Sequence, residues 1–224
     1  AVSEAIGKEA MKYGAEKNKI TVVHSSVIDE LLNMNSVSYK SNNSFEILSI
    51  GRHHWKKGYH YALDAMKILK DEGIKFKYTI IAQGDLPEEI IFMIDDYKLE
   101  EEVNIVKGMP YDELIKYLSK CNLLLLPSVE EGIANVVLEA MAVGVPVLTT
   151  DCGGMSEVVT DRSNGYIVPV RDPEQIAVKV KEFIDSKTEV KYKMIENAKE
   201  TIKAEFTREK QNADFKKFYK SLMN

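Results

Sequence analysis

Short apolar runs alternate with segments of helical periodicity from about residue 45 to residue 186, and this alternation restricts the possible folds of the 224-residue chain. The apolar runs predict strands at residues 46–50, 78–82, 103–106, 123–126, 145–149 and 166–168. Helical patterns cover residues 60–69, 87–97, 112–119, 135–143 and 173–184, with Asp112 as an N-cap. Because parallel strands require crossover connections that place helices on both faces, we expect an α/β fold with three αβα layers and a six-stranded parallel sheet.

The two flanks lie outside this alternation and suggest three parts, residues 1–44, 45–186 and 187–224. Residues 1–16 look helical, residues 19–24 look like an edge or connecting strand, and residues 36–44, rich in Ser and Asn, look like a flexible link. The tail carries ten basic and six acidic residues and is predicted to be helical, with Thr207 as an N-cap. One side of it bears Phe215, Phe218, Tyr219 and Leu222. This side could pack on the same chain or contact a partner domain or an anionic membrane surface.

Composition excludes several classes of protein. The net charge of −5 argues against a nucleic-acid partner, since phosphate binding needs clustered Lys and Arg. No apolar run is long enough to span a bilayer. Cys121 and Cys152 lie in apolar patterns and suit a reducing cytosol, so we expect a cytoplasmic protein, with peripheral binding at the inner face of the membrane as an option.

Several catalytic motifs are missing from the sequence. There is no GxGxxG, no phosphate-binding loop ending in Gly-Lys-Ser or Gly-Lys-Thr, and no GxSxG. The four histidines show no metal-ligand spacing, and there is no Asp-x-Asp. We therefore expect neither a metal site nor a cofactor.

The first informative loop is residues 51–58, between a predicted strand and a predicted helix. Gly51 and Gly58 at its ends permit a turn and a close approach to a ligand. Arg52 and Lys57 offer a planar fork and a point charge to the same space, which suits a diphosphate. Alternatively, the two cations are simply solvated.

The second informative loop follows the most hydrophobic strand, at residues 127–142. Glu131 lies in the loop, Asn135 starts a helix, and Glu139 follows about one turn later. Free N–H groups from Gly132 to Asn135 can bind an anion or a hydroxyl group. A carboxylate can accept two O–H donors, so the two glutamates suit one sugar at each end of a diphosphate. A purely structural pair of glutamates is the alternative.

An ordered set of residues in this chain resembles the family 4 glycosyltransferases, which are retaining enzymes of the GT-B architecture. The matching residues are Gly51-Arg52, Lys57-Gly58, Lys107-Gly108, Pro127-Ser128, Glu131, Glu139-Ala140-Met141-Ala142, Gly144-Val145-Pro146-Val147, Gly153-Gly154, Glu157 and Asn164-Gly165. The chain departs from the family pattern at His53-His54-Trp55, Ala134 and Asn135. The resemblance covers roughly residues 20–185 and implies that the sheet is a Rossmann-like domain, one half of a GT-B fold.

The resemblance also implies roles for individual residues. Arg52 and Lys57 would hold the diphosphate of a nucleotide-sugar donor, and Glu139 would accept the ribose hydroxyls. Glu131 would touch the transferred sugar as the catalytic residue. The other donor contacts would come from Gly132, Ile133, Ala134, Asn135 and Val136, with Met109 and Pro110 facing the base. Gly153-Gly154 would shape the pocket wall, while Glu157 would be structural.

The implied function is the C-terminal, donor-binding domain of a hexosyltransferase. The whole enzyme would use a UDP-sugar or GDP-sugar, act on a glycan or lipid-linked acceptor, and serve polysaccharide or lipopolysaccharide biosynthesis. The chain begins Ala-Val-Ser-Glu without an initiator Met, and residues 1–35 look like the end of a missing N-terminal domain. We therefore expect the chain alone to transfer no sugar. The alternatives are a non-catalytic GT-B half that serves assembly, or a related GT-B epimerase or phosphorylase.

Overall fold

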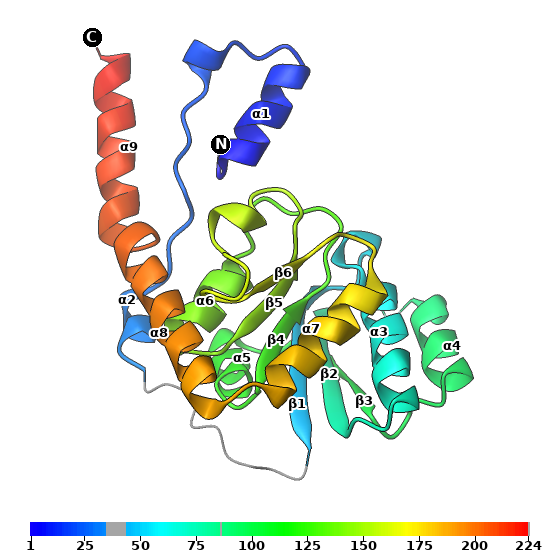
Figure 1. Ribbon diagram of the computed structural model, residues 1–224. Helices are drawn as coiled ribbons and strands as arrows, with labels where there is room; N and C mark the ends of the chain where they lie inside the picture. Colours follow the sequence, from blue (N-terminus) through cyan, green and yellow to red (C-terminus); the bar gives the residue numbers. More distant parts are fainter. Residues whose placement is uncertain (35–43, 86, 224) are drawn as a thin grey trace.

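The computed structural model, which describes residues 1–34, 44–85 and 87–223, contains the expected six-stranded parallel sheet between two layers of helices (Figure 1). The strands are β1 (Phe45–Arg52), β2 (Phe76–Gln83), β3 (Val103–Lys107), β4 (Leu123–Leu126), β5 (Val147–Thr150) and β6 (Tyr166–Val168). Their order across the sheet is β3-β2-β1-β4-β5-β6, so the direction of winding reverses between β1 and β4. The predicted Rossmann-like α/β class is confirmed.

Helices cover both faces of the sheet (Figure 1). Those that follow the strands are α3 (Tyr59–Asp71), α4 (Glu88–Asp96), α5 (Tyr111–Leu118), α6 (Asn135–Val143) and α7 (Pro173–Asp185). The flanks add α1 (Glu4–Lys12), α2 (Asp29–Leu32), α8 (Thr188–Glu205) and α9 (Arg208–Leu222). Three short 3-10 turns complete the described part: η1 (Lys17–Lys19), η2 (Trp55–Lys57) and η3 (Met155–Glu157).

Each face of the sheet buries its own hydrophobic cluster. Helices α3, α4 and α7 contribute to one cluster and α2, α5 and α6 to the other, while α8 contributes to both. The interior strands β4 and β5 are buried along their whole length, which explains why their sequences are apolar runs without alternation. Burial on both faces holds the ends of these strands, and the loops that leave them, in fixed positions.

Two local expectations were wrong, and one was confirmed. Residues 19–24 form no strand: their backbone bonds run to Ala1, to η1 and its neighbour Glu16, and from the Gln211 side chain, and none runs to a strand of the sheet. Pro110, and not Asp112, is the N-cap of α5, which places Asp112 in the first turn. The tail is two helices broken at Phe206, and Thr207 caps the second as expected, accepting a bond from the N–H of Lys210. The predicted link lies mostly outside the described residues.

The first helix is attached to the domain through Glu157. The carboxylate of Glu157 accepts the backbone N–H groups of Glu4 and Ala5, each at 3.0 Å, and lies 3.2 Å from Nε2 of His24. Free N–H groups at a helix N-terminus favour a carboxylate. Glu157 is therefore a structural residue, as expected. None of the described helices is long and apolar enough to cross a bilayer.

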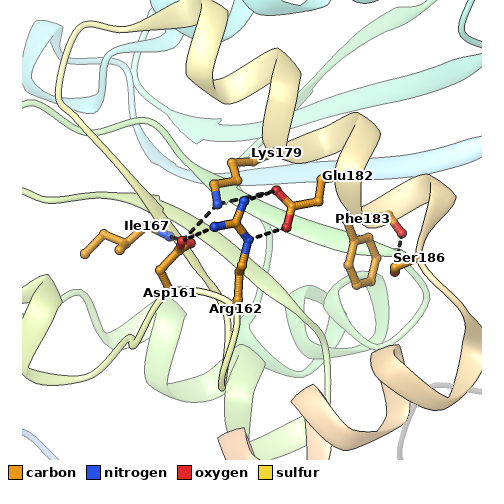
Figure 2. Close-up of polar contacts among 7 residues, drawn as sticks. All are labelled: Asp161, Arg162, Ile167, Lys179, Glu182, Phe183 and Ser186. Atoms are coloured by element: carbon orange, nitrogen blue, oxygen red, sulfur yellow. Dashed lines mark hydrogen bonds and ion pairs between the residues drawn. The ribbon is translucent and has the colours of Figure 1, made fainter.

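A cluster of four charges attaches the connection between β5 and β6 to α7 (Figure 2). Lys179, whose side chain is only 7% exposed, lies 2.9 Å from the Asp161 carboxylate and 3.5 Å from that of Glu182. Arg162 grips Glu182 with Nε and Nη2, at 2.5 and 2.8 Å. The hydrogen bond from Arg162 lowers the pKa of Glu182 below its ordinary value of 4.5, and Lys179 adds to this effect. The cluster joins the β5–β6 connection to α7, and we assign it a structural role.

Replacing Lys179 by methionine is expected to lower the free energy of unfolding by about 2 kcal/mol at pH 7, because two carboxylates lose a buried counterion. Lys193→Met, which removes a pair with exposed Glu196, should change it by less than about 0.5 kcal/mol. Urea denaturation measures both. Because the folded-state pKa of Glu182 is lowered, its contribution is present above pH 4.5 and lost as the pH falls further. Equal losses in the two variants, or no weakening of the Lys179 effect in acid, would contradict this assignment.

Candidate functional site

The candidate site lies at the carboxyl ends of β1 and β4, where the strand order reverses. In open α/β sheets the loops diverge at this point and leave a crevice for ligands. Two loops border it: residues 53–58, which connect β1 to α3, and residues 127–134, which connect β4 to α6. Both of the loops that the sequence singled out therefore meet at one place.

The β1–α3 loop is a tight turn held by its own backbone. The His54 ring caps η2 by accepting the Lys56 N–H, and Gly58 then takes a left-handed conformation with φ of 65° before α3 begins. A Cβ on Gly58 would collide with the carbonyl oxygen of Pro127, so only glycine permits this approach to the second loop. We expected Gly51 to permit a turn at the start of this loop, but Gly51 lies inside β1 and makes no turn.

The β4–α6 loop is held by contacts from β5 and from the turn after it. Thr150 Oγ1 donates to the carbonyl of Ser128, and the Gly154 N–H donates to the carbonyl of Gly132 at 2.7 Å. A Cβ on Gly153 would overlap the carbonyl oxygen of Glu131, which explains the glycine pair. Gly153 and Gly154 pack against this loop, but they are not among the residues that line the cavity described next.

The N-terminus of α6 points its free backbone groups toward the same edge of the sheet. Its N-cap, Ala134, makes no side-chain capping bond. The first N–H groups of a helix have no intrahelical partner and attract anions or hydroxyl oxygens. The backbone of residues 132–136 thus has the polarity expected for a ligand contact.

Two ion pairs join the loops. Lys56 contacts Glu130 at 2.7 Å near the surface, and Lys57 contacts Glu131 in a less exposed position. The side chains of Lys57 and Glu131 are only 19% and 15% exposed, and Glu131 also accepts the Ser128 hydroxyl at 2.9 Å. The backbone adds a bond from the Val129 N–H to the Lys56 carbonyl at 2.7 Å. The two loops therefore form one unit.

A cavity of about 280 Å³ opens beside this unit. Its lining comes from the ends of β1, β2 and β3 and from α5: Ile50, Gly51, Arg52, Lys57, Ile81, Gln83, Gly108, Met109 and Leu114. Arg52 and Lys57 supply its positive charge, while Met109 and Leu114 supply an apolar wall. This combination suits a ligand with an anionic group and a flat, weakly polar ring.

Glu139 is half-buried on α6 and accepts a hydrogen bond from the Tyr111 hydroxyl at 3.2 Å. Burial raises the pKa of Glu139, and the bond from Tyr111 partly opposes this shift. Burial and the charge of Glu139 raise the pKa of Tyr111 to about 12, so its hydroxyl stays a donor at neutral pH. One carboxylate oxygen is thereby oriented for a further donor.

The structure brings most of the predicted residues to one edge of the sheet. Arg52, Lys57 and Met109 line the cavity, and Glu131 contacts Lys57. Pro110 and Glu139 do not line it, but Tyr111 directly follows Pro110 and bonds to Glu139. The remaining five predicted residues, Gly132, Ile133, Ala134, Asn135 and Val136, lie in the loop and first turn that lead into α6.

Sequence reasoning gave no site role to Ser128, Tyr111, Gln83 and Tyr59, which the structure places at or beside this edge. A signal existed for two of them, since Ser128 directly follows a buried strand and Tyr111 opens a helix next to the predicted Pro110. Gln83 and Tyr59 carry no local signal. Within the described residues, no three His, Cys, Asp or Glu side chains gather as a metal ion would require.

Comparison with known proteins assigns the family. The model for "Glycosyl transferases group 1" matches residues 33–201, which is most of the chain. The chain belongs to this glycosyltransferase family. It is 34% identical over 170 residues to the amylovoran biosynthesis glycosyltransferase AmsK of Erwinia amylovora, covering 73% of this chain and 42% of AmsK.

Solved structures of similar fold are GT-B glycosyltransferases, and two of them match nearly the whole chain. A glycosyltransferase from Rickettsia africae superposes with a TM-score of 0.90 at 19% identity, covering 100% of this chain and 63% of that chain. Anabaena HepE, solved in complex with UDP-glucose, superposes with a TM-score of 0.87 at 19% identity, covering 99% and 63%. The group 1 chain described here spans about half the length of the curated relatives that it matches.

Proposed function

We propose that this chain is the donor-binding half of a retaining glycosyltransferase that takes a hexose from a UDP-sugar or GDP-sugar. The observation that carries the proposal is the cavity at the ends of β1, β2 and β3, beside the two joined loops, which combines Arg52 and Lys57 with an apolar wall at Met109. HepE, a protein of the same fold, was solved with UDP-glucose, which supports a nucleotide sugar as the ligand. The acceptor would be a glycan or a lipid-linked glycan, in line with the name of AmsK.

The proposed roles are those that the family resemblance implies, and the positions of the side chains support them. Arg52 and Lys57 bind the diphosphate and neutralise the charge that develops on the leaving nucleotide. Glu131, in the β4–α6 loop, contacts the transferred sugar, and the free N–H groups of residues 132–136 bind its hydroxyls or the phosphate. Glu139, oriented by Tyr111, accepts the ribose hydroxyls. Met109 and Pro110 face the base.

The acceptor half would come from an N-terminal domain that docks beside α1 and α9. These two helices project from the same side of the domain (Figure 1). Between them lies an apolar cavity of about 520 Å³ whose walls include Val2, Ile6, Phe215 and Phe218. An exposed apolar region of this kind is typical of an interface. Without that domain we expect this chain to bind a donor but to transfer no sugar.

A thermal-shift and calorimetric screen with UDP, GDP and ADP tests the proposal. Binding stabilises the fold by RT ln(1 + [L]/Kd), which is about 2.7 kcal/mol at a hundredfold excess over Kd. For a chain of this size we expect a rise in Tm of about 5–10 °C with one of these nucleotides. An unchanged Tm with millimolar amounts of all three would contradict donor binding and favour a non-catalytic assembly module.

A further inference from the structure

The Lys57–Glu131 ion pair conflicts with the roles that the proposed function gives to its two members. Lys57 is assigned to the diphosphate and Glu131 to the sugar, yet in this structure each is the partner of the other. The inference below rests on that proposed function. A bound diphosphate would compete with Glu131 for the three N–H donors of Lys57, so we expect donor binding to weaken the ion pair.

Glu131 would then lose its counterion at a position where little water can solvate the charge of its carboxylate. Its side chain is 15% exposed, and the remaining hydrogen bond comes from Ser128 Oγ at 2.9 Å. A carboxylate in such a place is strongly destabilised unless another donor replaces the lost one. We therefore expect a hydrogen-bond donor near Glu131 that has no partner in the free protein.

Tyr59 is the candidate for that donor. It is the first residue of α3 and is 5% exposed, and its hydroxyl is buried with no hydrogen-bond partner among the described residues. The hydroxyl lies beside the Lys57 side chain: the Tyr59 oxygen and Lys57 Cε lie 2.9 and 3.1 Å from the point that a Cβ on Gly51 would occupy. The missing side chain of Gly51 makes room for both.

The surroundings leave the Tyr59 hydroxyl free for this role. The next buried hydroxyl, that of Tyr78, donates to Ser49 Oγ at 2.8 Å, and Ser49 Oγ donates to the Leu125 carbonyl at 2.6 Å, so this chain of bonds is already complete. Burial and the negative charge of Glu131 raise the pKa of Tyr59, which keeps its proton in place at any working pH. Buried groups without a partner are rare in proteins and call for a specific explanation.

We propose that Tyr59 is a positioning residue for Glu131: when the donor diphosphate draws Lys57 away, the Tyr59 hydroxyl donates a hydrogen bond to the Glu131 carboxylate. The hydroxyl without a partner destabilises the free protein. Its hydrogen bond to Glu131 then stabilises the donor complex. Tyr59 thereby couples diphosphate binding to the orientation of the carboxylate that contacts the sugar.

The test is Tyr59→Phe, which removes only the hydroxyl. In the free protein this variant should have an equal or higher Tm, because an unpartnered buried polar group disappears. Its Kd for UDP-glucose, or for whichever nucleotide sugar the wild type binds, should rise about tenfold. The sign of the two effects is opposite, which a purely structural tyrosine would not produce. The control is Tyr78→Phe, a buried tyrosine whose hydroxyl is bonded; it should lower Tm and leave Kd unchanged.

A second measurement isolates the partner. In a Glu131→Gln background the charge-assisted bond is lost, so adding Tyr59→Phe should raise Kd by less than about threefold. A lower Tm for Tyr59→Phe overturns the inference whether or not any nucleotide binds. An unchanged Kd in Tyr59→Phe, with clear binding by the wild type, also overturns it while leaving the proposed function intact. Absence of binding by the wild type would overturn the proposed function instead, and the Tm result then decides whether Tyr59 is unsatisfied.

Discussion

Gly58→Ala is expected to lower the free energy of unfolding by about 3 kcal/mol and to weaken nucleotide binding at least tenfold. Two effects add. A left-handed conformation at φ of 65° costs alanine about 1 kcal/mol, and the new Cβ would collide with the Pro127 carbonyl oxygen. Relief of that collision requires the β1–α3 and β4–α6 loops to separate, which moves Lys57 away from Glu131. Urea denaturation and calorimetry measure the two losses.

Gly73→Ala is the matched control for this prediction. Gly73 also has a positive φ, 77°, but a Cβ there would meet no atom within 4 Å. The Gly73→Ala variant should lose only about 1 kcal/mol of its free energy of unfolding, from the positive φ alone, and its Kd for nucleotide should be unchanged. If Gly58→Ala behaves like Gly73→Ala in both measurements, then the contact between the two loops is not needed for the site.

Lys57→Ala is expected to raise the Kd for a nucleoside diphosphate about 10- to 100-fold. A charge-assisted hydrogen bond to phosphate contributes about 1.5–3 kcal/mol, and each 1.4 kcal/mol is tenfold in affinity. The loss is increased because Glu131, left without its counterion, would repel the diphosphate. Calorimetry measures the change, and the fluorescence of Trp55, the only tryptophan and 56% exposed in the adjacent turn, gives a second signal.

Lys56→Ala provides the comparison for Lys57→Ala. Lys56 is the preceding residue and also forms an ion pair between the two loops, but its pair with Glu130 is exposed and worth less than about 1 kcal/mol. The Kd of the Lys56→Ala variant for a nucleoside diphosphate should stay within about twofold of the wild-type value. Equal Kd values for the two variants would mean that the diphosphate does not contact Lys57 and would require a different binding mode.

The site residues differ in how far they are buried, and we expect their roles in binding to differ accordingly. Arg52 and Met109 line an open cavity, whereas Glu131 and Tyr59 lie where water is largely excluded. Electrostatic contacts are stronger in such a low-dielectric place, so a change of partner there has a large effect. For this reason we expect discrimination between a nucleotide and a nucleotide sugar to depend on the inner residues, and overall affinity to depend on the cations.

The amino-acid sequence by itself determined the elements of this domain and the two loops that matter. The Asn135–Val143 helix was predicted with its correct ends, and all six strands were found, because apolar runs, Gly144 and the strand-end glycines are local signals. The same reasoning predicted a strand at residues 19–24, where a β-like sequence meets no sheet edge. Local pattern cannot say which neighbours a segment will have.

Only the tertiary structure decided how the site residues pair. Lys57 and Glu131 are 74 positions apart, and they meet because the strand order places β4 beside β1. The buried, unsatisfied hydroxyl of Tyr59 likewise lies where a side chain on Gly51, in strand β1, would meet it. The physical reason is that hydrophobic periodicity and turn residues act over a few positions, whereas an ion pair or an orphaned hydroxyl depends on which strands become neighbours when the sheet forms.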